Sequence, residues 1–316
     1  MLAPELAAAM LYPMLEPLDK GSGPIIPAPT HYHLIGETGK HTLWAGFILM
    51  TITAGTFSLL SYNVPLSKRI YHVLATLTAI ISALAYFAAA TGQTSSLVCH
   101  PIRDSHHNHG DTPVETWHDS CRQVFWARYL DWFLTTPLVL INLCLLGGIS
   151  GAHTLAAVAA NAVVIIASWA AAYGTAAGRG ASEKETDSLR KTAIWGWFTI
   201  GVLAYLVVVW HVGLNGARSV RHKGARLVTV WSTLAGYVLA VWAAYVVVWA
   251  VAPIAQKTTV DGEIISYLVL DVLAKAVFGL WLLVTNRSIP ESNIDLTGYW
   301  SQGLSAEGLI RLPEEE

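Results

Sequence analysis

The stretch IISYLVLDVLAKAVFGLWLLV, residues 264–284, decides how the chain folds. It is almost entirely apolar, and a helix of this length crosses a bilayer core of about 30 Å at about 1.5 Å per residue. Asp271 and Lys275 lie at its middle, where each costs roughly 2.5–3.5 kcal/mol. Because they are four residues apart, they share a helical face and partly neutralise each other. Such residues predict a functional site, with a structural ion pair between helices as the alternative.

The whole chain has the composition of a membrane protein. Of its 316 residues, 54% are hydrophobic and only 13% are charged. The formal net charge of −2 predicts no nucleic-acid partner. Three cysteines are too few for a disulfide scaffold. The lipid bilayer is therefore the first partner that we expect.

Long apolar segments predict an all-α membrane protein, a seven-transmembrane-helix bundle over residues 41–287. Residues 1–40 read as a loose N-terminal segment, because Pro and Gly punctuate them. Residues 92–123 form a long loop, and residues 288–316 form a polar tail that ends in three glutamates. The expected helices cover about residues 41–63, 70–91, 124–147, 153–175, 191–212, 228–252 and 263–285.

Seven crossings place the two termini on opposite sides of the membrane. Arg218, Arg221, Lys223 and Arg226 crowd into one short loop that has no acidic residue. Because short positively charged loops stay in the cytoplasm, we expect the N-terminal segment and loop 92–123 outside and the tail inside. The expected location is the plasma membrane.

The helix expected over residues 124–147 also carries charge inside the membrane. Arg128, Asp131, Thr135 and Asn142 fall on one face, since steps of three, four and eleven residues return to the same side of a helix. Arg128 and Asp131 would balance Asp271 and Lys275 in a closed quartet between the two helices, which low dielectric tolerates better than any single charge. The alternative is a purely structural salt-bridge cluster.

Aromatic side chains line the expected surroundings of the lysine. Trp242, Tyr245 and Trp249 step along one helical face, and Trp132 follows Asp131 directly. Such a stripe is usually core packing. Together with a desolvated lysine and two carboxylates, it predicts a long conjugated ligand held as a Schiff base, which lysine amines form with carbonyl compounds.

Two stretches carry a resemblance to a known family: ARYLDWFLTTPLVL at 127–140 and LVLDVLAKAVFG at 268–279. They resemble the microbial (type 1) rhodopsins, in the bacteriorhodopsin-like and fungal branch. The resemblance implies a photoreceptor and not an enzyme. It implies all-trans retinal as cofactor, bound as a Schiff base on Lys275, and protons as the transported species. Whether the protein is a monomer or a homo-oligomer stays open.

The resemblance also assigns roles to the charged and polar residues. Asp131 takes the place of the primary counterion and proton acceptor, and Asp271 that of the second counterion. Arg128 is similar to the arginine that gates the outer half-channel, and Thr135 to the threonine that hydrogen-bonds the acceptor. Glu263 is similar to a proton-release glutamate.

The remaining matches concern the pocket. Trp132, Trp242 and Tyr245 match retinal-pocket walls, and Tyr86 matches the tyrosine that bonds the second counterion. Asn161 stands near the ring end in place of a common aspartate. Phe198 and Tyr205 are expected to line the same end. No metal ligands belong to this predicted site.

Asn142 is the departure that matters most, because an outward proton pump usually has a carboxylic donor at this place. An amide cannot hand over a proton. Reprotonation would then come through water from the cytoplasm, and the cycle would be slow. The first hypothesis is therefore a light-driven outward proton pump with a slow photocycle. The alternatives are a photosensory receptor that signals to a partner, a light-gated channel, and a structural membrane protein without retinal.

Val246 is a second departure, because the family usually has proline at this place. The usual kink of its helix is therefore in doubt.

Loop 92–123 is rich in histidine and carries two cysteines. If the loop lies outside, where disulfides persist, Cys99 and Cys121 near its ends could form a bridge or remain free. The histidines could bind zinc or copper, could sense pH near their ordinary pKa of ~6.5, or could belong to an ordinary solvated loop. They are His100, His106, His107, His109 and His118.

Overall fold

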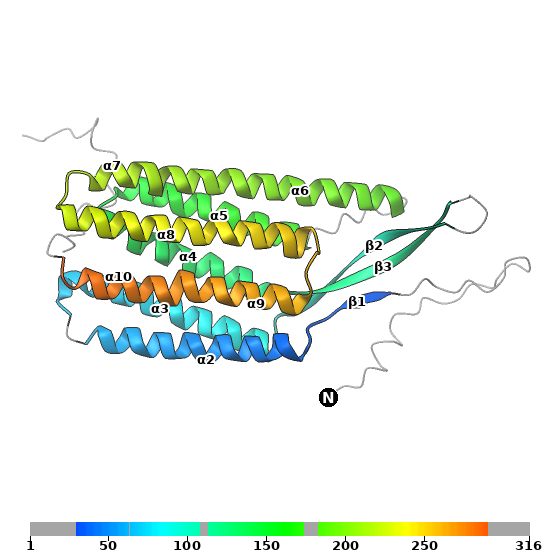
Figure 1. The fold of residues 1–316 in the computed structure, drawn as a ribbon, viewed down its shortest axis with the longest axis horizontal. Coiled ribbons are helices and arrows are strands. Elements are labelled where there is room, and N and C mark those ends of the chain that lie inside the picture. The colour runs from blue at the N-terminus through cyan, green and yellow to red at the C-terminus, as the bar shows by residue number, and fades with distance from the viewer. Residues whose placement is uncertain (1–29, 63, 108–112, 174–182, 290–316) are drawn as a thin grey trace, which may run out of the picture.

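A computed structural model describes residues 30–62, 64–107, 113–173 and 183–289 of the chain. Within these ranges seven helical passes lie side by side, each long and apolar enough to cross a membrane (Figure 1). The prediction of a seven-helix bundle is confirmed. The single-element passes are α2 (Glu37–Leu60), α3 (Leu66–Ala90), α4 (Trp126–Gly147) and α5 (Gly151–Tyr173).

The last three passes each contain a π-helical turn. They are α6 (Glu183–Val208) with η1 (Val209–Asn215) and α7 (Gly216–Val220), α8 (Ala225–Trp249) with η2 (Ala250–Ile254), and α9 (Val260–Asp271) with η3 (Val272–Val277) and α10 (Phe278–Asn286). Such turns are uncommon and occur often at functional sites. Val246 lies within the regular part of α8, and the irregular turn follows it, around Pro253. The helix therefore departs from α geometry after Val246 and not at it.

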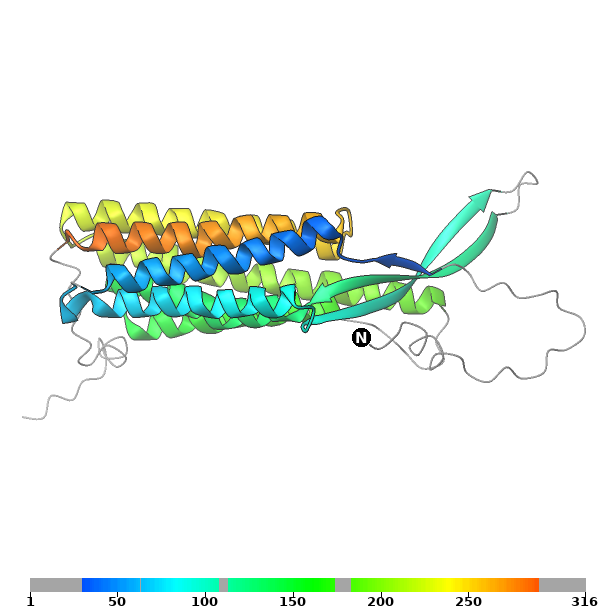
Figure 2. The ribbon, with the colours of Figure 1, turned by 90° about the horizontal axis from the view of Figure 1, so that it is seen from below.

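The loop expected over residues 92–123 is mostly a β-hairpin. Strands β2 (Ser95–His107) and β3 (Pro113–Phe125) pair antiparallel, and β1 (His31–His33) pairs parallel with β3, giving the order β1-β3-β2. The sheet projects beyond one end of the helices, which we call the sheet end (Figure 2). Cys99 and Cys121 face each other across the hairpin and form a disulfide.

The expected boundary at residue 40 lies inside α2, because that helix begins at Glu37. Residues 31–33, expected in the loose segment, are a strand because β3 offers a free edge for backbone hydrogen bonds. Asp261, from the first turn of α9, accepts a hydrogen bond from the backbone nitrogen of Gly36 at 2.7 Å and so ties α9 to the start of α2. Residues 1–29 and 290–316 lie outside the described part of the chain.

The interior differs between the two halves of the bundle. The buried carboxylates, with Lys275 and Arg128, lie between its middle and the sheet end. The half toward the opposite end is mainly apolar, with Leu140, Leu143, Leu146, Leu234 and Leu282 buried in it, and its buried polar side chains near that end include Lys68, His72 and Asn286. Large apolar side chains are exposed around the outside, as expected for helices that face lipid.

Candidate functional site

Lys275 lies at the centre of the bundle, in the π-helical turn η3. Its Nζ is 2.5 Å from Oδ2 of Asp131 on α4 and 3.1 Å from Oδ1 of Asp271 at the end of α9. All three side chains are at most 3% exposed. A buried ammonium needs this kind of compensation, because each unpaired charge would carry a large desolvation cost. The structure therefore brings together the two carboxylates and the lysine expected from the sequence.

Asp271 accepts three further hydrogen bonds. Tyr86 donates to its Oδ2 at 2.6 Å, which is the bond expected from the sequence. Tyr245 donates to Oδ1 at 2.6 Å, and the indole nitrogen of Trp132 donates to the same oxygen at 3.2 Å. Gly46 on α2 leaves room for the ring of Tyr86, because a Cβ at position 46 would lie 2.5 Å from that ring. With so many donors fixed around it, this carboxylate is held in one position.

Asp131 is held by a residue that the sequence did not single out. The hydroxyl of Ser82 on α3 donates to its Oδ1 at 2.7 Å. Thr135 hydrogen-bonds Asp131 as expected, but at its backbone: the hydroxyl donates at 2.7 Å to the carbonyl of Asp131, one turn back in α4. A threonine in a helix readily satisfies its hydroxyl in this way. Asp131 thus has the lysine on one oxygen and a serine on the other.

Arg128 is not a member of the expected quartet. Its Nη1 lies 2.5 Å from Oε1 of Glu263, and its guanidinium carbon lies 4.5 Å from the ring centre of Tyr267. Arg122 on β3 binds the other glutamate oxygen at 2.8 Å and also donates to the carbonyl of Thr258 at 3.0 Å. The four expected charges therefore divide into two clusters because Glu263, one turn below the sheet end, is the nearer acid for Arg128. If all groups are ionised, the lysine cluster carries one net negative charge and the arginine cluster one net positive charge.

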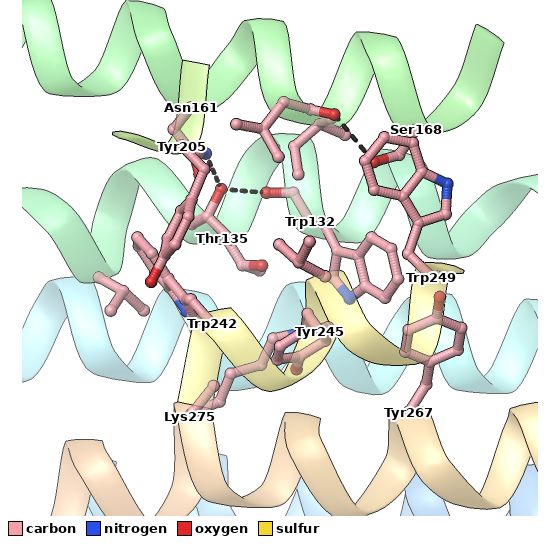
Figure 3. A pocket seen from close by; sticks show the side chains of 16 residues that line it. Trp132, Thr135, Asn161, Ser168, Tyr205, Trp242, Tyr245, Trp249, Tyr267 and Lys275 are labelled. Carbon is pink, nitrogen blue, oxygen red and sulfur yellow. Dashed lines mark hydrogen bonds between the residues drawn. The ribbon is translucent and has the colours of Figure 1, made fainter. Parts of the chain in front are cut away.

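A cavity lies beside Lys275. Its walls are predominantly apolar and aromatic, with a few polar groups among them, which is the usual composition of a small-molecule site. Figure 3 shows the lysine extending into the space between the aromatic side chains of α4 and α8. The lining residues are Trp132, Thr135, Thr136, Val139, Asn161, Val164, Ile165, Ser168, Tyr205, Trp242, Tyr245, Val246, Trp249, Tyr267, Ala274 and Lys275.

Asn161 lines this cavity as expected, and its amide nitrogen donates to the hydroxyl of Thr136. Phe198, expected to line the same end, is not part of the cavity wall. Its ring packs against Trp249, with centroids 4.9 Å apart, and lies among side chains next to the cavity and not in its wall. Tyr205, seven residues further along α6, lines the cavity instead, and its hydroxyl donates to the carbonyl of Leu239 at 2.5 Å.

Two more cavities lead from the lysine cluster toward the sheet end. One, of about 350 Å³, lies between Arg128 and the two aspartates. The next, of about 470 Å³, is bordered by Arg122, Glu263, Arg190 and His100. The pKa of His100, on β2, is lowered to about 4, first by burial and then by the nearby positive charge of Arg190. Cavities bordered in part by charged side chains thus lie on both sides of the arginine cluster.

Asn142 is buried on the other side of the lysine, toward the opposite end of the bundle. Its amide nitrogen lies 3.4 Å from the carbonyl of Tyr71, and its amide oxygen has no hydrogen-bond partner within the described ranges. Val139 and Leu143 on the same helix are buried around it. Asn142 is thus surrounded on its own helix by apolar side chains, and on α3 the buried His72 follows Tyr71, whose carbonyl the amide contacts.

Residues 37–289 match the bacteriorhodopsin-like protein family. The chain belongs to this family of microbial rhodopsins. It is 47% identical to Opsin-1 of Neurospora crassa over the whole length of both chains. The light-driven proton pump LR (Mac) from Leptosphaeria maculans is 42% identical, with a TM-score of 0.74 over 83% of this chain and 99% of that one. The light-driven proton pump CsR from Coccomyxa subellipsoidea is 31% identical, with a TM-score of 0.67 over 80% and 99%.

This rhodopsin is therefore a multi-pass integral membrane protein, and members of its family bind retinal. The predicted family is confirmed. The names of the relatives describe opsins and proton pumps and not enzymes.

Sequence reasoning missed Ser82 and Arg122, which contact the charged residues of this rhodopsin directly. Ser82 stands alone in an apolar run, four residues before Tyr86, and this spacing on one helical face was the available signal. Arg122 had no such signal, because its approach to Glu263 depends on the hairpin. As for metals, the part of the chain described here holds no cluster of three or more His, Cys, Asp or Glu side chains arranged for one. The side chains of residues 101–118, among them four of the five loop histidines, lie outside that description.

Proposed function

We propose that this rhodopsin is a light-driven outward proton pump with a slow photocycle. All-trans retinal is bound covalently through Nζ of Lys275, with the sheet end outside the cell and the protein in the plasma membrane. The observation that carries the proposal is the asymmetry around Lys275. Two carboxylates, two arginines and a glutamate cluster on the sheet side of Lys275, whereas directly inward of it on α4 stand Val139, Leu143 and the amide of Asn142, with no carboxylate among them.

The residues around Lys275 fit the chromophore. The amine opens into a cavity with flat aromatic walls, and the carboxylates beside it offer the charge that would compensate a proton on Nζ. When bound, retinal supplies absorption of visible light and a change of shape on absorbing it. Trp132 and Trp242 border the cavity and would restrict how the bound molecule moves.

Asp131 is positioned to take the proton from Lys275 Nζ. The distance of 2.5 Å to Oδ2 is within direct transfer range, and Ser82 fixes the other carboxylate oxygen. Asp271 is nearly as close to Nζ, but its two oxygens already accept hydrogen bonds from Tyr86 and Tyr245. The less heavily bonded carboxylate is therefore the acceptor, and Asp271 stays as the fixed counter-charge.

Arg128 and Glu263 would pass the charge toward the outside. Arg128 borders the cavity that contains Asp131, and it is also bound to Glu263. When Asp131 becomes neutral, the arginine loses one of its negative neighbours and binds the glutamate more strongly. Glu263 also borders the cavity next to the sheet, and its carboxylate would take up the proton that leaves Asp131 and pass it on into that cavity.

Asn142 makes the return of the proton slow. Its amide cannot donate a proton, so the proton that restores Nζ must come from the cytoplasm, through a half of the bundle whose buried side chains are mainly apolar and include no carboxylic acid among the described residues. A slow cycle also suits a photosensory receptor, which is the second candidate because of this same residue.

Light-driven pH change in intact cells distinguishes the two candidates. Cells that express the chain with added all-trans retinal should acidify the medium in light, and a protonophore should abolish the change. A pigment that forms but produces no protonophore-sensitive acidification would overturn the pump and leave the sensor.

The covalent site is tested by the absorption spectrum. The purified apoprotein should develop a visible band with retinal, and Lys275→Ala should develop none. A visible band that persists in Lys275→Ala would refute attachment at this lysine. Lys223→Ala is the matched control, since that lysine lies in the short loop between α7 and α8, away from the cavity.

A further inference from the structure

Two histidines face each other at the end of the bundle opposite the sheet. His153 lies in the first turn of α5, and His211 lies in η1 on the neighbouring pass. Their Nδ1 atoms are 2.9 Å apart, their ring centroids are 5.1 Å apart, and the rings are inclined by 45°. His153 is exposed and His211 is half-buried. The proposed proton path does not use this pair.

The backbone around His211 is unusual in the same place. Residues Val209–Asn215 form a π-helical turn within a pass that is otherwise α-helical, and this turn packs against α5. Such a turn widens the helix by one residue and is frequent at functional sites. The rare conformation therefore coincides with the contact between the two imidazoles.

From this geometry we propose that His153 and His211 bind a divalent transition-metal ion of the copper and nickel class through their two Nδ1 atoms, with water in the remaining positions. Metal–nitrogen bonds of about 2.0–2.1 Å at right angles put two ligand nitrogens about 2.9 Å apart. The hydrogen bond of the metal-free pair already holds the two nitrogens at this separation, so binding at right angles needs little movement, whereas tetrahedral angles would require about 3.3 Å. Square-planar or tetragonal geometry with nitrogen and oxygen ligands is typical of Cu²⁺ and Ni²⁺.

The proton balance of this binding is simple. Without metal, one neutral imidazole donates its Nδ1 proton to the lone pair of the other across 2.9 Å. When a metal binds, the donating ring carries its proton on Nε2 instead, so both Nδ1 lone pairs face the ion. No proton is released when both rings start neutral. Since the ligands come from two helices, the ion would fasten α5 to the pass that follows it.

Copper titration of the untagged, full-length protein in detergent tests the site. After removal of trace metal with a chelator, one equivalent of Cu²⁺ should give an electron paramagnetic resonance spectrum with splitting from two nitrogens and should raise the melting temperature. His153→Ala and His211→Ala should each weaken copper binding at least about tenfold, the lower end of what loss of an outer-shell partner costs. Neither should change the melting temperature of the metal-free protein by more than a few degrees.

His222→Ala is the matched control, because His222 is exposed in the loop that follows α7 at the same end of the bundle. It should bind copper as the natural chain does. If both variants of the pair keep the natural affinity and the same spectrum, copper is bound elsewhere, for example by the histidines of residues 100–118, and the proposal is overturned. Its failure would leave the proton-pump proposal untouched, since the readout requires no light.

Discussion

Asn142→Asp is the substitution that tests the slow cycle most directly. The residue lies eleven positions beyond Asp131 on α4, about 16 Å at about 1.5 Å per residue, and it is almost fully buried. This separation is too long for one proton transfer, so the inner half depends on water and on whichever group stands at position 142. An aspartic acid can give up a proton there, and the natural amide cannot.

The magnitude follows from the source of the proton. If the natural chain takes its proton from the cytoplasm, the rate of recovery after a flash should fall about tenfold for each unit that the pH rises. A positioned general acid typically contributes about 10²–10⁴-fold. Recovery in Asn142→Asp should therefore be at least about a hundredfold faster near pH 7 and nearly independent of pH between about pH 6 and pH 8.

Flash photolysis of the pigment in lipid vesicles measures both quantities. Asn161→Asp is the matched control, because it introduces the same carboxylic acid at another buried asparagine, one that lines the retinal cavity and not the inner half. It should leave the pH slope unchanged. A natural chain whose recovery does not depend on pH, or an Asn142→Asp variant that recovers at the natural rate, would refute the reasoning.

Three further predictions concern residues outside the cytoplasmic path. Ser82→Ala should lower the free energy of unfolding by about 1.5–3 kcal/mol, the contribution of a hydrogen bond to a charged group, as measured by thermal denaturation. Replacing Cys99 and Cys121 by serine opens a bridge that spans 22 residues and should destabilise the hairpin by about 3 kcal/mol, as measured by protease sensitivity. The pKa of His100 is about 4 in the folded protein, below its ordinary value, so the neutral form stabilises the docked hairpin above pH ~6.5. That stabilisation should decline as the pH falls from about 6.5 to about 4, as measured by amide hydrogen exchange in β2, and His100→Gln should remove the decline.

Each of these predictions has a control in the chain. Ser266→Ala removes a hydroxyl that bonds only its own helix, at the carbonyl of Gly262, and should cost less than Ser82→Ala. A reducing agent should destabilise the natural hairpin and leave the double serine variant unchanged. His41→Gln, at an exposed position of α2, should keep the acid sensitivity of β2. Equal effects in variant and control would contradict the assigned contact.

The seven helices and the central charges could be predicted because both can be recognised in the amino-acid sequence alone. Apolar runs long enough to span a bilayer have few other interpretations, and Asp271 and Lys275 in mid-membrane are too costly to be incidental. Their four-residue spacing already implied proximity. Asp131 followed from the same reasoning on a second helix.

The contacts that could not be predicted depend on how separate elements are placed in space. Arg128 could have paired with Asp131 or with Glu263. The position of Glu263 along the bundle axis, which the sequence does not give, decides for Glu263. Phe198 and Tyr205 lie on nearly the same face of one helix, about 10 Å apart along its axis, and the height of the cavity in the bundle determines which ring reaches it. The π-helical turn at Lys275 has no signature in its sequence, VLAKAV, because every residue in it also suits an α-helix.

The bridge between Cys99 and Cys121 also has a meaning for biogenesis. Cytosolic glutathione keeps thiols reduced, whereas the secretory lumen and the cell exterior let a disulfide persist. The bond thus marks the compartment that its hairpin entered during synthesis. It supports the proposed orientation without reference to lysine and arginine counts. A hairpin delivered to the cytosol would keep two free thiols, and labelling with a thiol reagent before and after reduction would count them.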